Sequence, residues 1–168
     1  MSSIIESCEI VLNELFLFSE ELIYLGDSIK DNRLEIFENE IGFELPHDYK
    51  YIMKRHNGIS LLGTAIIGFH KSYKEASLDA VYKFEHSVVT HKIPKEFLPF
   101  SPDGRGNHYC FNLAKTKNGI SPVIFWQWDY DYDNIDEAEE ANESLVAWIK
   151  EVMIDWKLES YNYDGTEK

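Results

Sequence analysis

The apolar residues at the start of the chain recur at helical spacing. From residue 4 to residue 25 they alternate steps of four and three, which places them on one face of a helix of about six turns: Ile4, Cys8, Val11, Leu15, Phe18, Leu22 and Leu25. The sequence therefore predicts an N-terminal helix over residues 1–26, ended by Gly26 and Asp27. The spacing also suits a coiled-coil seam between two copies, but further apolar residues widen the stripe, which favours packing on the domain's own core.

A second helix is predicted from about residue 32. Asn32 and Glu35 have the spacing of a capping box, in which each side chain bonds a backbone N–H at the start of the helix. One face of this helix carries three apolar residues that we expect to be buried: Leu34, Phe37 and Ile41.

A third helix is predicted between Pro46 and Asn57-Gly58. Proline suits a first helical turn because its missing N–H has no partner there, and Asn-Gly suits a left-handed exit from the helix. The face at helical spacing between these two ends consists of Tyr49, Ile52, Met53 and His56.

Strand patterns dominate the middle of the chain. Apolar runs bounded by turn residues predict strands within residues 59–69, 97–100, 108–113 and 122–128. Asn118-Gly119 is a hairpin signal between the last two of these runs.

Two more helices and a tail complete the prediction. Residues 73–89 return to helical spacing, with a stripe of Ala76, Ala80, Val81 or Tyr82, and Phe84. A C-terminal helix would bury Leu145, Trp148, Ile149, Val152 and Trp156, and residues 159–168 would form a flexible tail. This order of elements predicts one α+β domain over residues 1–168, in which a mostly antiparallel sheet packs against N-terminal, central and C-terminal helices.

Three stretches of the chain carry motifs in a defined order. They read F-E-N-E-I-G-F-E-L-P-H-D-Y-K-Y-I-M-K-R-H-N-G at 37–58, D-G-R-G-N-H-Y-C-F-N at 103–112, and P-V-I-F-W-Q-W-D at 122–129. The ordered set resembles the SUKH superfamily, the Smi/Knr-like proteins, over residues 34–156. The positions that match the structural motifs of that superfamily are Gly42, Leu45, Pro46, Tyr49, Asn57, Gly58, Gly104, Gly106 and Asn107.

The resemblance implies a function in protein binding. Bacterial members of the superfamily are mostly immunity proteins that bind and neutralise polymorphic toxins, so a cognate toxin is the expected partner. The superfamily also includes fungal regulators of cell-wall synthesis, which makes a regulatory or scaffolding module the alternative. Those relatives are longer, and the lack of their extra segments here favours the immunity interpretation.

The charge of the chain is strongly negative and unevenly spread. The net charge is −14, and residues 118–168 alone hold 13 acidic and 3 basic residues. A surface of this sign repels phosphate backbones, so nucleic-acid binding is not expected, whereas a basic protein partner would be attracted. The alternative is that the charge only keeps the protein soluble.

The cysteine content and the apolar runs indicate a cytoplasmic protein. With only Cys8 and Cys110 present, a disulfide framework is excluded and a reducing compartment is expected. The most apolar N-terminal run is interrupted by Asn13 and Glu14, so neither a signal peptide nor a membrane span is expected. We expect a monomer or a weak homodimer.

Motifs for catalysis do not occur in the sequence. There is no phosphate-binding loop, no nucleophile elbow and no His-Glu-x-x-His, and the six histidines are scattered. The glycines of Asp103-Gly104-Arg105-Gly106 lead into a strand, which favours a simple turn. We therefore expect a binding protein and not an enzyme, with no catalytic residues, no cofactor and no metal site.

Residues 129–143 are the candidate binding region. They include eight carboxylates and no Lys or Arg, with two tyrosines between the first three acids. Tyrosine beside dense negative charge is typical of a surface that steers and anchors a basic partner. The predicted partner-binding residues are Asp129, Tyr130, Asp131, Tyr132, Asp133, Asp136, Glu137 and Glu140.

The same region allows two other interpretations. It can be a solvated acidic loop without a partner. It is also a partial match to a calcium loop, because Asp129, Asp131, Asp133 and Glu140 occupy ligand positions, although Asn134 stands where the template has glycine.

The strand before this region carries two tryptophans two residues apart. Trp126 and Trp128 would share one face of a strand, and Phe125 and Gln127 the other. We expect both tryptophans to point inward, which would leave Phe125 exposed.

Overall fold

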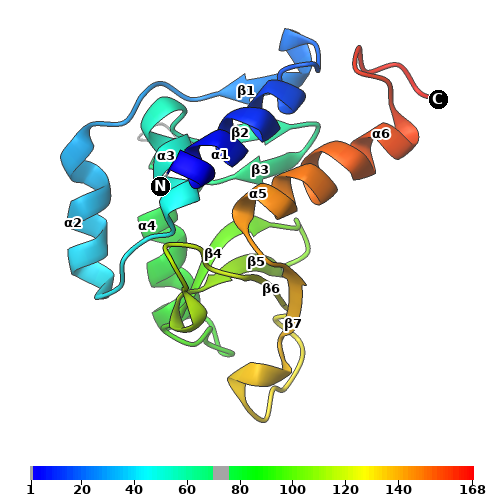
Figure 1. Ribbon diagram of the computed structural model, residues 1–168. Coiled ribbons are helices and arrows are strands. Elements are labelled where there is room, and N and C mark those ends of the chain that lie inside the picture. The colour runs from blue at the N-terminus through cyan, green and yellow to red at the C-terminus, as the bar shows by residue number, and fades with distance from the viewer. Residues whose placement is uncertain (1, 70–75) are drawn as a thin grey trace.

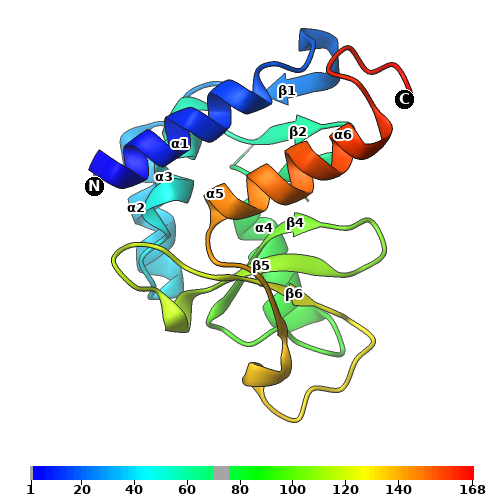
Figure 2. The same ribbon diagram turned by 45° about the vertical axis from the view of Figure 1, so that its right-hand side comes forward.

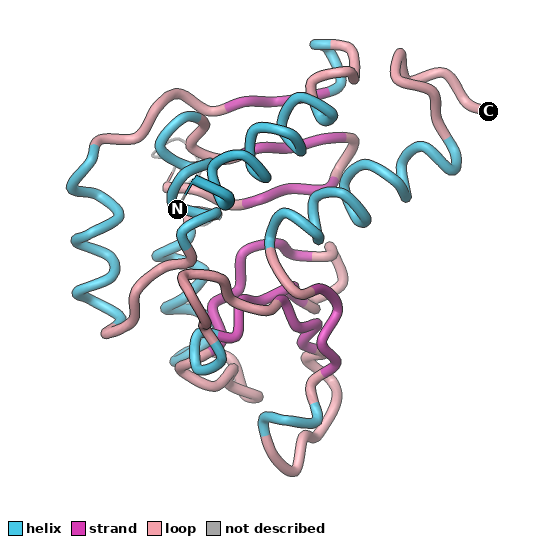
Figure 3. Tube along the Cα trace, viewed as in Figure 1, coloured by secondary structure: helices cyan, strands magenta, loops and turns pink. Residues whose placement is uncertain are grey.

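Seven strands form two antiparallel sheets in the computed structural model, which describes residues 2–69 and 76–168 (Figure 1). The first sheet has the order β1 (Ile23–Leu25), β2 (Ile59–Leu61), β3 (Thr64–Ile66). The second has the order β4 (Phe97–Pro102), β5 (His108–Asn112), β6 (Val123–Trp126), β7 (Glu139–Asn142). Figure 3 shows these strands as two groups, and the N–H of Ile67 donates to the carbonyl of Phe100 at 2.8 Å between them.

Helices cover the sheets. They are α1 (Ser2–Leu15), α2 (Asp31–Ile41), α3 (His47–Arg55), α4 (Leu78–Lys83), α5 (Leu145–Trp148) and α6 (Trp156–Ser160). A π-helical segment, Ile149–Asp155, joins α5 to α6, and another, Phe84–Val88, continues α4. Helix α1 and the continuous helix from α5 to α6 lie side by side (Figures 1 and 2). The predicted α+β class with antiparallel sheets is confirmed.

The N-terminal helix ends at Leu15, ten residues before the end of the apolar pattern. The next apolar residues leave the helical path, and Ile23, Tyr24 and Leu25 pair with β2 as a strand. Backbone pairing with β2 overrides the helical spacing of these residues. Ile23 is β-branched and Tyr24 is aromatic, and both residue types favour strands. Phe18 is still buried, as predicted, but it lies in a turn.

Helix α2 also begins differently from the prediction. It starts at Asp31, with Lys30 as its N-cap residue, so Asn32 lies inside the helix and the predicted capping box is wrong. The predicted face is correct in its first two members, because Leu34 and Phe37 are buried and Ile41 is half-buried.

Helix α3 follows the prediction closely. Pro46 precedes its first residue, and the side chains of Tyr49, Ile52 and Met53 are buried. The helix ends at Arg55, so Gly58, with φ +92°, turns the chain into β2 and does not form the helix exit itself.

The central helix begins later than predicted but ends where it was expected. Residues 73–75 of the expected range lie outside the described part of the chain, and the helix runs from Leu78 through α4 and the π-helical segment to Val88. Its buried side chain is Leu78, whereas Ala76 and Phe84 of the expected stripe are exposed.

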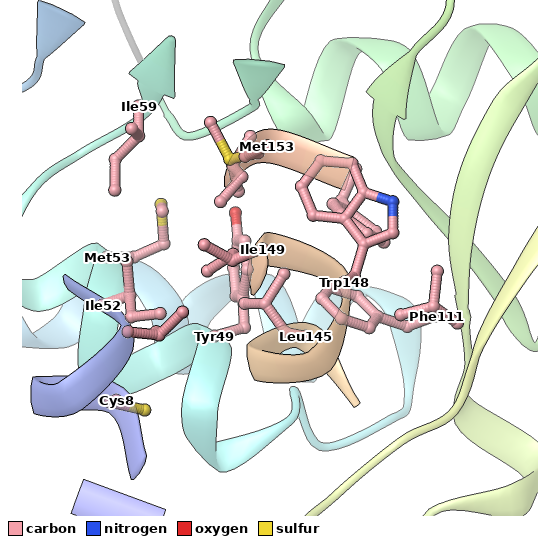
Figure 4. Packing of buried hydrophobic residues seen from close by; sticks show 14 of the residues in the cluster. Cys8, Tyr49, Ile52, Met53, Ile59, Phe111, Leu145, Trp148, Ile149 and Met153 are labelled. Atoms are coloured by element: carbon pink, nitrogen blue, oxygen red, sulfur yellow. The ribbon is translucent and has the colours of Figure 1, made fainter. Parts of the chain in front are cut away.

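The core forms where α3 and the C-terminal helix meet the sheets (Figure 4). Tyr49 contacts Phe111 edge-on at 5.5 Å between ring centroids, and Trp148 contacts Phe100 in the same way at 5.0 Å. Edge-to-face pairs of this kind add about 0.5–1.5 kcal/mol each beyond burial of area. The hydroxyl of Tyr49 donates to the carbonyl of Ile67 at 2.7 Å, which joins α3 to the end of β3.

The C-terminal helix buries a different set of residues from the one predicted. Leu145, Trp148, Ile149 and Val152 are buried as expected, but Trp156 is 48% exposed. The π-helical segment explains the change, because its wider turns shift the buried face by about one residue. Met153 and Ile154 are buried instead.

The segment 159–168 lies against residues 18–22, which follow α1. The N–H of Ser19 donates to the carbonyl of Tyr163 at 2.9 Å, and the ring of Tyr163 lies 4.9 Å from that of Phe18.

Within the described ranges, we find no helix of the length and apolarity that a membrane crossing requires.

Candidate functional site

The acidic region predicted to bind a partner forms the connection between β6 and β7. It begins with an irregular loop after Trp126, passes through a single 3₁₀ turn at Ile135–Glu137, and enters β7 at Glu139. In Figures 1 and 2 this connection projects from the end of the molecule that is remote from both termini. We call residues 127–143 the acidic loop.

Tyr132 holds the acidic loop against the second sheet. Its ring stacks on Trp126 at 4.3 Å between centroids, and its hydroxyl accepts a hydrogen bond from the N–H of Gln127 at 2.9 Å. Burial is the main cause that raises the pKa of Tyr132 above its ordinary value. Tyr132 was predicted to contact the partner, but its ring packs inward and supports the loop. Tyr130 is the tyrosine that faces solvent, with 50% of its surface exposed.

All eight carboxylates of the acidic loop are exposed. Asp131 lies 3.6 Å from His91, and Asp136 lies 3.4 Å from Lys115. Exposed pairs such as these contribute little to stability. The carboxylate of Glu137 accepts a hydrogen bond from the N–H of Asp133 at 2.7 Å. Glu137 therefore stabilises the conformation of the loop in addition to contributing negative charge.

Trp128 is the main departure from the predicted face pattern. Strand β6 ends at Trp126, so the alternation of inward and outward side chains stops there. Trp126 is buried, but Trp128 is 51% exposed. The prediction that both tryptophans point inward is therefore wrong. Phe125 is half-buried and not exposed, since its ring packs against Tyr109 at 4.9 Å.

The indole of Trp128 lies on the glycine turn between β4 and β5. A Cβ atom built on Gly106 would come within 2.6 Å of Trp128 Cδ1, and Gly106 has φ +94°. Asn107 completes the contact, because its side-chain oxygen accepts from the N–H of Trp128 at 3.2 Å. The motif at 103–107 thus holds the exposed Trp128 at the start of the acidic loop.

The other motif residues shape turns. Gly42 ends α2 in the left-handed conformation, φ +76°. The N–H of Leu45 donates to the Glu38 carboxylate at 2.7 Å. Gly104 has φ +82°, and the carboxylate of Asp103 accepts from the side-chain amide of Asn107 at 2.8 Å, so this segment is the turn that the sequence indicated.

The calcium-loop template is not built by the fold. Glu140, the last ligand position, lies in β7 opposite Ile124 instead of folding back over the loop. Within residues 2–69 and 76–168, no three His, Cys, Asp or Glu side chains are grouped so that they could hold a metal ion.

The structure also contains a cavity that the sequence does not predict. A cavity of about 540 Å³ opens between α1, α3 and the start of α5. Asp48 lies in its wall and has no solvent exposure. Burial raises the pKa of Asp48 to about 6, against the opposing effect of the backbone N–H groups of Tyr49, Leu145 and Val146. The sequence shows Asp48 only as part of the Leu-Pro-x-Asp-Tyr motif, because the other walls come from distant segments.

Comparison with protein families places these features in a known group. A family model described as SMI1-KNR4 cell-wall, SUKH_6, matches residues 31–149. The matched range includes the α3 motif, the 103–107 turn and the acidic loop, and the chain belongs to the SUKH superfamily. No curated protein matches the chain.

Proposed function

We propose that this protein is an immunity protein that binds a basic cognate toxin in the bacterial cytoplasm and neutralises it by covering its active cleft. Membership of the SUKH superfamily supports a role in binding and not in catalysis. The observation that carries the proposal is the acidic loop itself, which holds eight exposed carboxylates and two half-exposed aromatic side chains, Trp128 and Tyr130.

The two kinds of side chain would act at different stages of binding. The carboxylates raise the rate of encounter with a basic surface, by an amount that falls with added salt. Trp128 and Tyr130 supply rigid apolar area, which is the kind of contact that dominates interface energies. A nuclease cleft is basic, so an acidic loop of this size could occupy it in place of the nucleic-acid backbone.

A regulatory or scaffolding module is the second candidate. The description of the matched family refers to the cell wall, which favours this alternative for its members. Such a module would use the same exposed surface, but its partner would not be toxic.

Toxicity and charge reversal together test the proposal. Expression of the toxin encoded beside this protein should stop growth, and co-expression of this protein should restore it. Changing Asp129, Asp131, Asp133 and Glu140 to lysine should abolish the protection and weaken binding at least a hundredfold, while the fold is kept because these side chains are exposed. Unchanged binding by this variant would sink the proposal that the acidic loop is the contact surface.

A further inference from the structure

Trp128 is half-exposed, yet its position is fixed by a separate segment of the chain. Its backbone N–H donates to the side-chain oxygen of Asn107 at 3.2 Å. Its indole lies over Gly106, where an added Cβ would come within 2.6 Å of Cδ1. The fold therefore holds a large aromatic ring at the surface in a defined place. A ring that is already held loses little entropy when a partner binds to it.

The contact with the glycine turn involves one part of the indole. The atoms nearest to the position of a Cβ on Gly106 are Cδ1, Nε1 and Cγ of Trp128, at 2.6, 2.9 and 3.2 Å. All three belong to the five-membered ring, so the six-membered ring lies farther from the turn. The face of an indole carries negative charge density, and it attracts cations more strongly than the rings of tyrosine or phenylalanine do.

The cations of the chain itself do not occupy this ring. In the described part of the chain, Arg33 lies over Phe69 and Arg55 lies over Tyr51, and no other cation lies over an aromatic ring. Arg105, although it belongs to the turn next to Gly106, is therefore not placed over Trp128. A cation on this ring would have to come from another molecule.

The charges that follow Trp128 in the chain favour one type of cation. Asp129, Asp131 and Asp133 are exposed, and the acidic loop contains no Lys or Arg. A guanidinium group is planar, so it stacks on an aromatic ring while the N–H groups at its edge remain available to carboxylates. An ammonium group is compact and strongly hydrated, and it cannot stack in this way. Arginine is therefore the side chain that complements this surface best.

We propose that Trp128 receives an arginine side chain of the partner protein, whose guanidinium stacks on the exposed ring and donates hydrogen bonds to carboxylates of the acidic loop. The site lies where the acidic loop leaves β6 (Figure 1). The proposal rests on the proposed function, because it takes the partner to be a basic protein that binds at this loop. It gives Trp128 a role that the carboxylates do not have, since they respond to charge whereas the ring distinguishes arginine from lysine.

Two peptides of equal charge test the site without the partner. Acetylated tetra-arginine amide and acetylated tetra-lysine amide are titrated into the ¹⁵N-labelled protein at pH 7.5, and the indole N–H signals are followed by NMR. We expect wild type to bind the arginine peptide about three- to tenfold more tightly than the lysine peptide, and the signal of Trp128 to shift with it. Equal affinity of wild type for the two peptides would overturn the proposal.

Three variants assign the preference to one ring. Trp128→Leu should lower the preference for arginine below about twofold, because the ring is removed while all carboxylates are kept. Trp128→Tyr keeps an aromatic face and should retain part of the preference. Trp156→Leu is the matched control, since Trp156 is also half-exposed but lies in α6, outside the acidic loop, and it should retain the whole preference. A preference that persists in Trp128→Leu, or that Trp156→Leu removes as well, would overturn the proposal.

The toxin separates this proposal from the one on which it rests. Trp128→Leu should weaken binding of the toxin domain encoded beside this protein at least about tenfold, as expected for an aromatic anchor in an interface. If the toxin binds wild type and Trp128→Leu equally well, Trp128 does not receive a toxin side chain, although the immunity function stands. If the toxin binds neither protein, the immunity function fails, and the comparison of the two peptides alone decides the role of Trp128.

Discussion

The ring of Tyr132 stacks on Trp126 at 4.3 Å between centroids, which ties the acidic loop to the second sheet. Trp126 in turn contacts Phe97 edge-on at 5.8 Å, so the stack continues into the small core under the sheet. The loop therefore presents its charges from a supported position. A preformed surface loses less entropy on binding than a mobile one.

Removing this support should destabilise the protein. For Tyr132→Ala we expect a loss of about 1–3 kcal/mol in the free energy of unfolding, because a half-buried ring and its stacking contact are removed. Tyr130→Ala is the matched control, since Tyr130 is 50% exposed and its loss should cost under about 0.5 kcal/mol. Urea denaturation followed by circular dichroism measures both. Equal losses would show that the stack does not support the loop.

The contact between Gly106 and Trp128 can be tested by a pair of glycine substitutions. Gly106→Ala should cost about 1–3 kcal/mol and should change the tryptophan fluorescence, because the backbone is left-handed and the new methyl group displaces the indole. Gly104→Ala has similar backbone strain, φ +82°, but its Cβ meets nothing within 4 Å. Its cost should be smaller and the fluorescence should stay unchanged. The same fluorescence change in both variants would contradict the described position of Trp128.

Asp48→Asn should stabilise the protein at neutral pH, because it removes a buried charge. The folded-state pKa of Asp48 is about 6 and its ordinary value is 3.8, so burial of the charged form opposes folding. The shift corresponds to about 1–3 kcal/mol at pH 7.5.

The pH dependence of this gain has a definite sign. As the pH falls from about 6 to about 4, folded Asp48 takes up a proton before the unfolded chain does, so the wild type regains stability and the advantage of Asp48→Asn shrinks. Thermal unfolding of both proteins between pH 4 and 7.5 measures the difference. A gain that does not change with pH would show that Asp48 is not charged at neutral pH.

The sequence predicts the elements that depend on local patterns. Strands β5 and β6 carry apolar runs between turn residues, and α3 lies between Pro46 and the Asn57-Gly58 turn, so both the class of fold and the family motifs could be recognised. The N-terminal helix was overestimated because Ile23–Leu25 continue the helical spacing, and only pairing with the distant β2 reveals a strand.

The features of the candidate site also differ in whether a local sequence pattern reveals them. The acidic loop is a continuous stretch of sequence, so its composition alone identifies it as a candidate. The exposure of Trp128 depends on where β6 ends, and the burial of Asp48 depends on α1, α3 and α5 coming together. No local pattern of the sequence shows either.

Binding of the cognate toxin is the most direct test of the central claim. This protein is titrated in a calorimeter with the toxin domain encoded beside it, at 50 mM and at 500 mM salt. The two titrations give the affinity and the part of it that depends on electrostatic attraction. The account predicts one-to-one binding of nanomolar affinity at low salt that weakens at high salt, because exposed charges are screened. No binding at either salt would contradict the immunity function, and tight binding that is insensitive to salt would contradict the role of the acidic loop.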